Sequence, residues 1–188
     1  RLPITPIPRY HGKMQKLHAF WAKCQGLDGS LQGRTAEESL ERSGWIRSVG
    51  GSSPYLGIMA RTGLSRATID KELANVRIHE LPSARGCTYV LPASDFATGL
   101  MVAQNNGDAA DLTTAIRYLG VTREEIDGLQ VKVLQTLQGK TLTPIEIKKE
   151  LGDAVRSLGD EGKKRGMTTT LGLALTPLQA QGKIRRIP

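Results

Sequence analysis

The sequence is poor in the residues that disulfide-stabilised and membrane-spanning proteins need. It has two cysteines, Cys24 and Cys87, among 188 residues, which excludes a disulfide framework and favours a reducing compartment. No apolar run approaches the roughly 20 residues of a membrane span, and no apolar signal core follows the N-terminal segment. We therefore expect a cytoplasmic protein with no membrane partner.

Motifs for metal, nucleotide and acyl-transfer chemistry are also missing. The histidines His11, His18 and His79 stand in neither an HExxH nor a Cys/His zinc spacing. The sequence holds no GxxxxGK[ST] loop and no GxSxG elbow. We expect no metal and no small-molecule cofactor.

Positive charge is what the sequence has in excess, and it gathers at the two ends. The formal net charge is +8. Residues 1–34 carry six basic residues against one acidic, and residues 153–188 carry seven against three, whereas residues 35–152 hold 13 against 14. An excess of basic residues is typical of proteins that bind nucleic acid, but it can also serve only to keep a protein soluble. Net charge alone does not distinguish these two interpretations.

The first half predicts four helices followed by a β-hairpin and another helix. Its prolines favour an extended arm over residues 1–12. Apolar periodicity, Thr35 with Glu38 as a capping box, and Ser65 as an N-cap predict helices over 13–25, 35–42, 54–63 and 65–74. Residues 76–81 and 87–91 alternate as two strands, and a helix over 94–104 follows. This is the element order of a winged helix-turn-helix, with Trp21 and Trp45 as expected core anchors.

The second half predicts a looser version of the same scheme. Helices are expected over 110–119, 122–138, 143–152 and 168–181, and Lys163–Arg165 in a glycine-flanked loop. Residues 183–187 look like a first wing strand, whose partner would follow Pro188. Since the chain also begins at Arg1 rather than methionine, we expect it to be a segment of a longer protein.

The expected fold is mainly α with small β-hairpins, built as tandem winged helix-turn-helix units. The predicted domains are an N-terminal arm, a first unit, a linker with a short helix, and a second unit truncated at its wing, over residues 1–12, 13–104, 105–121 and 122–188.

Three segments of the sequence resemble one family. Gln25-Gly-Leu27, the stretch from Ser43 to Arg61, and the stretch from Arg85 to Asp95 are similar, in order and spacing, to motifs of the bacterial alkylpurine and crosslink DNA glycosylases. The resemblance implies tandem winged helices that act in DNA repair. The family's two water-holding polar residues, which flank an aliphatic one, correspond to the positions of Arg47, Ser48 and Val49 here.

These three positions do not carry the family's chemistry. Val49 has no hydrogen-bonding side-chain atom, and Arg47 only donates and stays charged, so neither can activate water. A serine without a neighbouring base is usually a plain loop hydroxyl, so we predict no catalytic residues. The family's hairpin histidine corresponds to Tyr89.

The candidate DNA contacts are arginines and lysines on the expected recognition helix, hairpin, C-terminal loop and terminal strand. They are Arg66, Lys71, Arg77, Arg85, Lys163, Lys164, Arg165, Arg185 and Arg186.

The sequence therefore predicts a winged-helix protein that binds duplex DNA without catalysis of its own, in the bacterial nucleoid. One alternative is an active DNA glycosylase that uses another water-holding site and flips the damaged base out of the stack. A second is a protein-interaction module that docks through the helix over 65–74. The sequence leaves the oligomeric state open.

Overall fold

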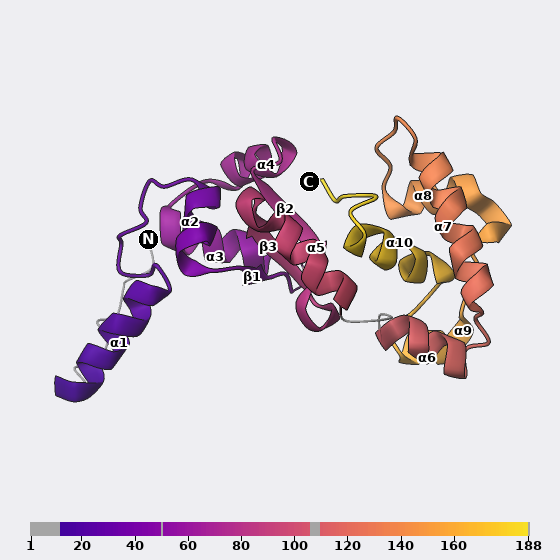
Figure 1. Cartoon of the computed structure of the whole chain (residues 1–188), viewed down its shortest axis with the longest axis horizontal. Helices are drawn as coiled ribbons and strands as arrows, with labels where there is room; N and C mark the ends of the chain where they lie inside the picture. The colour runs from indigo at the N-terminus through magenta and orange to yellow at the C-terminus, as the bar shows by residue number, and fades with distance from the viewer. Residues whose placement is uncertain (1–11, 50, 106–109, 188) are drawn as a thin grey trace.

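The computed structural model describes residues 12–49, 51–105 and 110–187. It has one small sheet, which lies among helices in the first half of the chain, and a second group of helices in the second half (Figure 1). The predicted arm over residues 1–12 lies almost entirely outside the described residues. The helices are α1 Gly12–Cys24, α2 Ala36–Ser43, α3 Ser53–Thr62, α4 Arg66–Ala74, α5 Phe96–Asn105, α6 Ala110–Tyr118, α7 Arg123–Leu137, α8 Pro144–Leu151, α9 Gly159–Lys164 and α10 Thr170–Ala180. The strands are β1 Ile46–Arg47, β2 Ile78–Pro82 and β3 Thr88–Pro92.

The first unit, from α2 to α5, places the sheet between two layers of helices. The strand order is β1-β3-β2, and both pairings are antiparallel. Val90 of the central strand β3 lies opposite Ile46 of β1 on one edge and opposite Glu80 of β2 on the other edge. One core cluster joins α2, α3 and α4 to the sheet. The other face of β2 meets α5, where His79 stacks on Phe96 with a centroid distance of 4.2 Å. The sheet is therefore covered on both faces.

Local capping explains how the helix-turn-helix begins. Thr35 and Glu38 form the predicted capping box of α2. The α2 N-terminus has a second cap, because the Glu72 carboxylate on α4 accepts hydrogen bonds from the backbone N–H of Ala36 at 2.9 Å and of Glu37 at 3.0 Å. A negative charge at this helix end is favourable, so Glu72 fastens α4 to α2.

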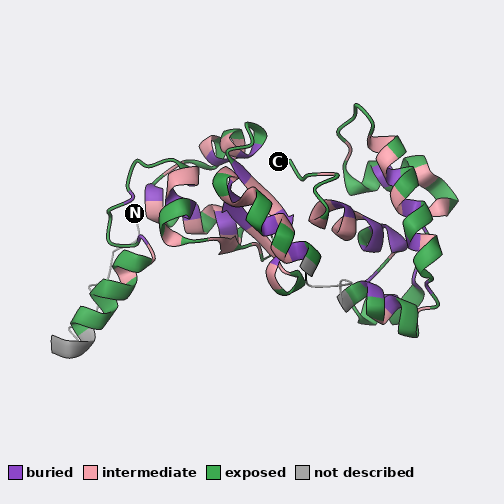
Figure 2. Cartoon of the chain, in the orientation of Figure 1, coloured by how far each residue is buried: buried purple, intermediate pink, exposed green. Residues whose placement is uncertain are grey.

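The second unit, from α6 to α10, has its own core of buried leucine, isoleucine and valine side chains (Figure 2). Leu112 of α6, Leu129 of α7 and Leu178 of α10 all belong to this core. An isolated bridge joins Ser157 to Thr169, and among the described residues no named strand falls in this unit.

The two units touch through the C-terminal segment. Helix α10 packs against β2 and α5 of the first unit. Residues 181–187 then run back toward α4, which brings the C-terminus close to the first unit (Figure 1). The Arg185 Nη1 donates to the Leu73 carbonyl at 3.4 Å, and the Arg186 Nη1 lies 3.3 Å from Glu80 Oε1.

The predicted fold class is confirmed: the described chain is mainly helical with a small antiparallel sheet. The predicted helices and the hairpin are present with ends shifted by a few residues, and α10 continues through Pro177. The sequence missed β1, which is only two residues long. The predicted domain boundaries stay predictions.

Two expectations for the second unit are wrong. Lys163 and Lys164 lie in the short helix α9 rather than in a loop, because the buried Gly162 lets its backbone approach that of Met167 closely. Residues 183–187 form no strand. They find no strand partner among the described residues and instead contact the first unit.

Trp21 is not a core anchor. It is 60% exposed, and Leu17 and Phe20 on the same face of α1 are exposed as well (Figure 2). Trp45 is half-buried, as expected of an anchor, and its Nε1 donates to Asp95 at 2.7 Å. The apolar stripe of α1 therefore has no cover within the described chain.

Candidate nucleic-acid interface

A groove of about 1040 Å³ runs between the two units. Its walls come from the hairpin tip, the end of α5, the starts of α6 and α7, and one face of α10. The charged residues that line it are Arg85, Arg123, Arg186, Asp111 and Asp127. The rest of the lining is mixed. Apolar side chains such as Leu112 and Leu175 line it together with the neutral polar side chains Thr88, Gln104, Gln130, Thr176, Gln179 and Gln181. Such side chains donate to phosphate oxygens and to base edges.

Arg85 stands at the tip of the hairpin and at the rim of the groove. Its backbone is left-handed, with φ 56° and ψ 29°, and the following Gly86 also has a positive φ of 68°. This tight turn pushes the Arg85 side chain outward, where it is exposed. Within the described residues its guanidinium has no hydrogen-bond or ion-pair partner, so its donors are available to a ligand.

Arg186 reaches the groove from the second unit. It lines the groove and is held by the Glu80 carboxylate at 3.3 Å. Of the nine predicted DNA contacts, Arg85 and Arg186 are thus brought to the same groove. Arg185 lies beside it in sequence but points its Nη1 at the Leu73 carbonyl.

The other predicted contacts lie outside the groove lining. On α4, Arg66 lies 3.7 Å from Asp70 and over the Tyr55 ring, while Lys71 is exposed without a partner in the described chain. Arg77 pairs with Glu37 at 3.5 Å.

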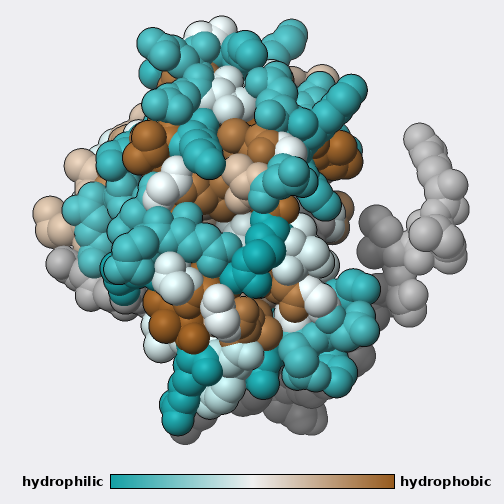
Figure 3. Space-filling model, turned by 90° about the vertical axis from the view of Figure 1, so that its right-hand side faces the viewer, coloured by the Kyte–Doolittle hydropathy of each residue, from teal (hydrophilic) through white to brown (hydrophobic). Residues whose placement is uncertain are grey.

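The basic cluster around α9 is engaged locally. Lys163 pairs with Asp160 at 3.1 Å, and Lys164 pairs with Glu161 at 2.6 Å. Arg165 lies over the Tyr118 ring, with 4.6 Å between its guanidinium carbon and the ring centre. These neighbours reduce the field that the cluster presents to a phosphate. Figure 3 views the molecule from the side of the second unit. On this face, brown apolar patches are separated by teal polar side chains, so no continuous apolar face is seen there.

Ser48 has the neighbouring base that the sequence did not reveal. Its Oγ donates to Glu80 Oε1 at 2.7 Å, and its backbone N–H donates to the Thr88 carbonyl at 2.8 Å, which extends the pairing of β1 with β3. Arg47 and Val49 take no part: the Arg47 carbonyl and the Val49 N–H instead share the Ser53 hydroxyl.

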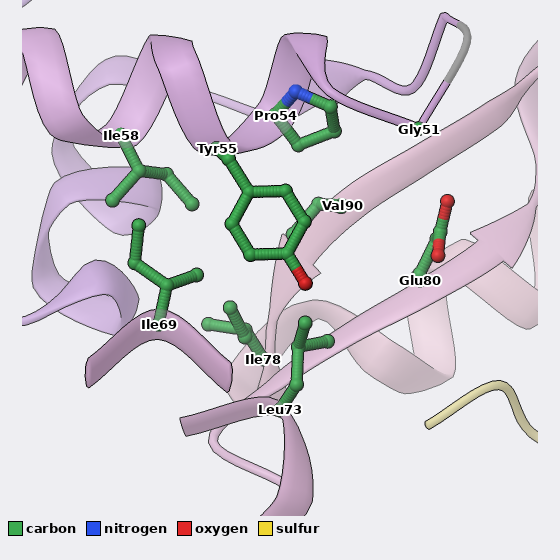
Figure 4. A pocket seen from close by; sticks show the side chains of 9 residues that line it. All are labelled: Gly51, Pro54, Tyr55, Ile58, Ile69, Leu73, Ile78, Glu80 and Val90. Carbon is green, nitrogen blue, oxygen red and sulfur yellow. The ribbon is translucent and has the colours of Figure 1, made fainter. Parts of the chain in front are cut away.

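Glu80 also stands at one end of a cavity of about 20 Å³ in the first unit (Figure 4). The Tyr55 ring lies in the middle of this cavity, with Ile58 and Ile69 at the far end from Glu80. Burial and a 2.5 Å hydrogen bond to Asp70 raise the pKa of the Tyr55 hydroxyl to about 12. Tyr55 therefore keeps its proton at neutral pH.

The three segments that carry the family resemblance are bound to one another. The Arg61 Nε donates to the Gln25 carbonyl at 2.7 Å, and burial lowers the pKa of the Arg61 guanidinium. Trp45 donates to Asp95, which lies at the end of the third segment. The shared residues thus have a structural role in joining α1, α3 and the hairpin.

Sequence reasoning missed Glu80 and Arg123. A signal for Glu80 was present, because the alternation places it on the same strand face as the buried Ile78. A charge on the core face of a strand needs partners. Arg123 follows the N-cap Thr122, so its place at the start of a helix was expected but its place in the groove was not.

The described residues contain no helix long and apolar enough to span a membrane and no cluster of three metal-binding side chains.

Comparison with known proteins gives one informative likeness. No family model and no curated protein sequence matches the chain. Among solved structures, the Streptomyces sahachiroi DNA glycosylase AlkZ superimposes with a TM-score of 0.64 at 23% sequence identity. The match covers 95% of this chain and 47% of that chain, so this chain spans about half the length of its structural neighbour. The predicted glycosylase-like fold is thereby confirmed, and at this identity the likeness concerns the fold alone.

Proposed function

We propose that this chain binds duplex DNA in the groove between its two units. The observation that carries the proposal is the groove itself, with an unengaged arginine at its rim and a second arginine reaching it from the other unit. The hairpin tip is the part of a winged helix that commonly reaches the DNA backbone or the minor groove. The structural neighbour is a DNA glycosylase, and the net charge of +8 also supports a polyanionic partner.

In this proposal Arg85, Arg123 and Arg186 contact phosphates. Asp111 and Asp127 line the same wall as Arg123, so the side of the groove formed by α6 and α7 carries charge of both signs, whereas Arg85 stands on the hairpin side. The other residues predicted as DNA contacts, on α4 and α9 together with Arg185, lie outside the groove lining and are not part of this proposal; nothing tests them. Association with the bacterial nucleoid follows from the same proposal.

The alternative of a docking module gains no support from α4. None of the exposed large apolar side chains of the described residues lies on this helix. The alternative of an active glycosylase needs a water-activating group other than the side chains at 47–49, and it stays a prediction.

The test is a salt titration of binding to a labelled, undamaged duplex, with Arg85→Ala and Lys71→Ala as a matched pair. Both residues are exposed cations without partners in the described chain, and only Arg85 lines the groove. We expect the affinity of the wild-type chain to fall steeply with salt. Arg85→Ala should weaken binding and reduce the slope of log K against log salt by about 0.9, and Lys71→Ala should change neither.

Two results would overturn the proposal. One is the absence of salt-dependent binding by the wild-type chain. The other is a loss of affinity in Lys71→Ala with none in Arg85→Ala, which would move the interface to α4.

A further inference from the structure

Part of the groove lining is neutral and polar and has no role in phosphate binding yet. Thr176 and Gln179 line the groove from one face of α10, and Gln130 lines it from α7, which packs against α10. All three side chains are half-buried. Within the described residues, none of them makes a hydrogen bond to another group of the protein. Two amides and a hydroxyl therefore present free donors and acceptors to a ligand in the groove.

The charges around Gln130 favour base edges over the DNA backbone. Arg123 and Gln130 stand at i and i+7 on one face of α7, so about 10 Å of helix separates them. Asp127 lies between them and also lines the groove. A carboxylate repels phosphates, but it can accept hydrogen bonds from the amino groups of bases. This stretch of α7 therefore suits the edge of a base pair.

A glycine on the same face of α10 is an independent sign of a close ligand. Gly172 lines the groove and is exposed, and a Cβ atom at this position would meet no atom of the chain within 4 Å. Glycine in a helix is unfavourable relative to alanine, and packing within the chain does not require it here. Its missing side chain leaves room for a ligand to approach the α10 backbone.

We propose that Gln130, Thr176 and Gln179 read base edges in the major groove of the duplex and that the protein favours A·T pairs. The inference deepens the proposed function and rests on it, since the duplex must lie in the groove between the two units. The arginines of the groove hold the phosphates in this arrangement, and the neutral side chains select the bases.

The preference for A·T pairs follows from the chemistry of these side chains. A glutamine amide has one acceptor and one donor group, which match N6 and N7 of adenine. Guanine presents two acceptors, N7 and O6, at the same edge, so the amide oxygen finds no donor there. Leu175 and the methyl group of Thr176 also line the groove and can contact the C5-methyl group of thymine.

The experiment compares the affinity of the chain for three undamaged duplexes of equal length at one salt concentration. They are alternating A·T, alternating G·C and alternating inosine·cytosine. An inosine·cytosine pair has the major-groove edge of a G·C pair but, like an A·T pair, lacks the guanine amino group in the minor groove. We expect the wild-type chain to bind the A·T duplex about fivefold more tightly, or better, than either of the others, because one bidentate contact supplies that discrimination.

Gln179→Ala should lose this preference. It should still bind the G·C duplex as tightly as the wild-type chain does, which also shows that the variant is folded. Its slope of log K against log salt should stay unchanged, since no phosphate contact is removed. Gln135→Ala is the matched control, because Gln135 is an exposed glutamine of α7 outside the groove lining, and this variant should keep the preference.

A pair of glycine variants tests the close approach to α10. Gly128 of α7 is also exposed, would also meet no atom within 4 Å of an added Cβ, and lies outside the groove lining. Gly172→Ala and Gly128→Ala should both be at least as stable as the wild-type chain in urea denaturation. Only Gly172→Ala should weaken binding to the A·T duplex, and equal affinities of the two variants would contradict the close approach.

The outcomes separate this inference from the proposed function. If the wild-type chain binds none of the duplexes, the proposed function fails and this inference fails with it. If it binds all three equally, or if Gln179→Ala keeps the preference, duplex binding stands and the reading of base edges is overturned. Equal affinity for the A·T and inosine·cytosine duplexes, both above the G·C duplex, would indicate readout in the minor groove and would also overturn it.

Discussion

Arg85 and Arg186 meet at one groove, but their surroundings give them different freedom. Arg85 has no hydrogen-bond or ion-pair partner within the described chain. Arg186 is paired with Glu80, so it must break or share that ion pair when it binds a phosphate. The Arg186 side chain is 54% exposed, so this ion pair contributes less than about 1 kcal/mol and a phosphate can compete for it. Arg85 should therefore contribute more to DNA affinity than Arg186 does.

Val76, just before the hairpin, has a strained backbone conformation whose cost in stability can be measured. Val76 follows α4 with a φ of 62°. Its N–H donates to the Leu73 carbonyl, and the N–H of Arg77 donates to the backbone carbonyl of Glu72. This is the position of a helix C-terminus that glycine usually occupies, because a β-branched side chain is strained there. Val76→Gly should raise the free energy of unfolding by about 1 kcal/mol in urea denaturation.

Val131→Gly is the control for that prediction. Val131 is also an exposed valine, but it lies inside α7, where glycine is unfavourable. It should lower the free energy of unfolding. A loss of stability in both variants would show that Val76 is not strained.

At the scale of elements, the helices and the hairpin were predictable because their signals are local. Thr35 forms the expected capping box, and the alternation around Ile78 and Val90 marks the two long strands. Helix α9 was missed because it depends on the burial of Gly162 against Met167, which is a tertiary contact. The segment 183–187 was misassigned for the same reason, since its alternation is typical of a strand but its partners lie in the other unit.

The contact between α4 and the N-terminus of α2 should be important for the stability of the first unit. Glu72 accepts two backbone hydrogen bonds there, and its removal leaves both donors without their charged acceptor. Glu72→Ala should lower the free energy of unfolding by about 2 kcal/mol in chemical denaturation. Lys71→Ala, one residue earlier and exposed, should change it by less than about 0.5 kcal/mol. Equal effects of the two variants would contradict this role for Glu72.

At the scale of the whole molecule, the candidate sites arise from the docking of two units. The groove uses residues from the hairpin, α7 and α10, and Glu80 is hydrogen-bonded by Ser48 of the first unit and by Arg186 of the C-terminal segment. Nothing local in the sequence specifies that docking, so the sequence predicted the basic residues but not which of them meet. That the positions of Arg47 and Val49 lack a water-activating group stays a prediction. The hydrogen-bond partner of Ser48, Glu80, could be identified only from the paired strands.

The most direct test of the account is amide hydrogen exchange of the chain with and without a short, undamaged duplex at saturating concentration. Binding in the groove predicts slower exchange in the segments 82–88, 123–130 and 172–181, with α1 and α9 unchanged. Protection confined to α4 or α9, with these three segments unchanged, would contradict the central claim that the duplex lies between the two units.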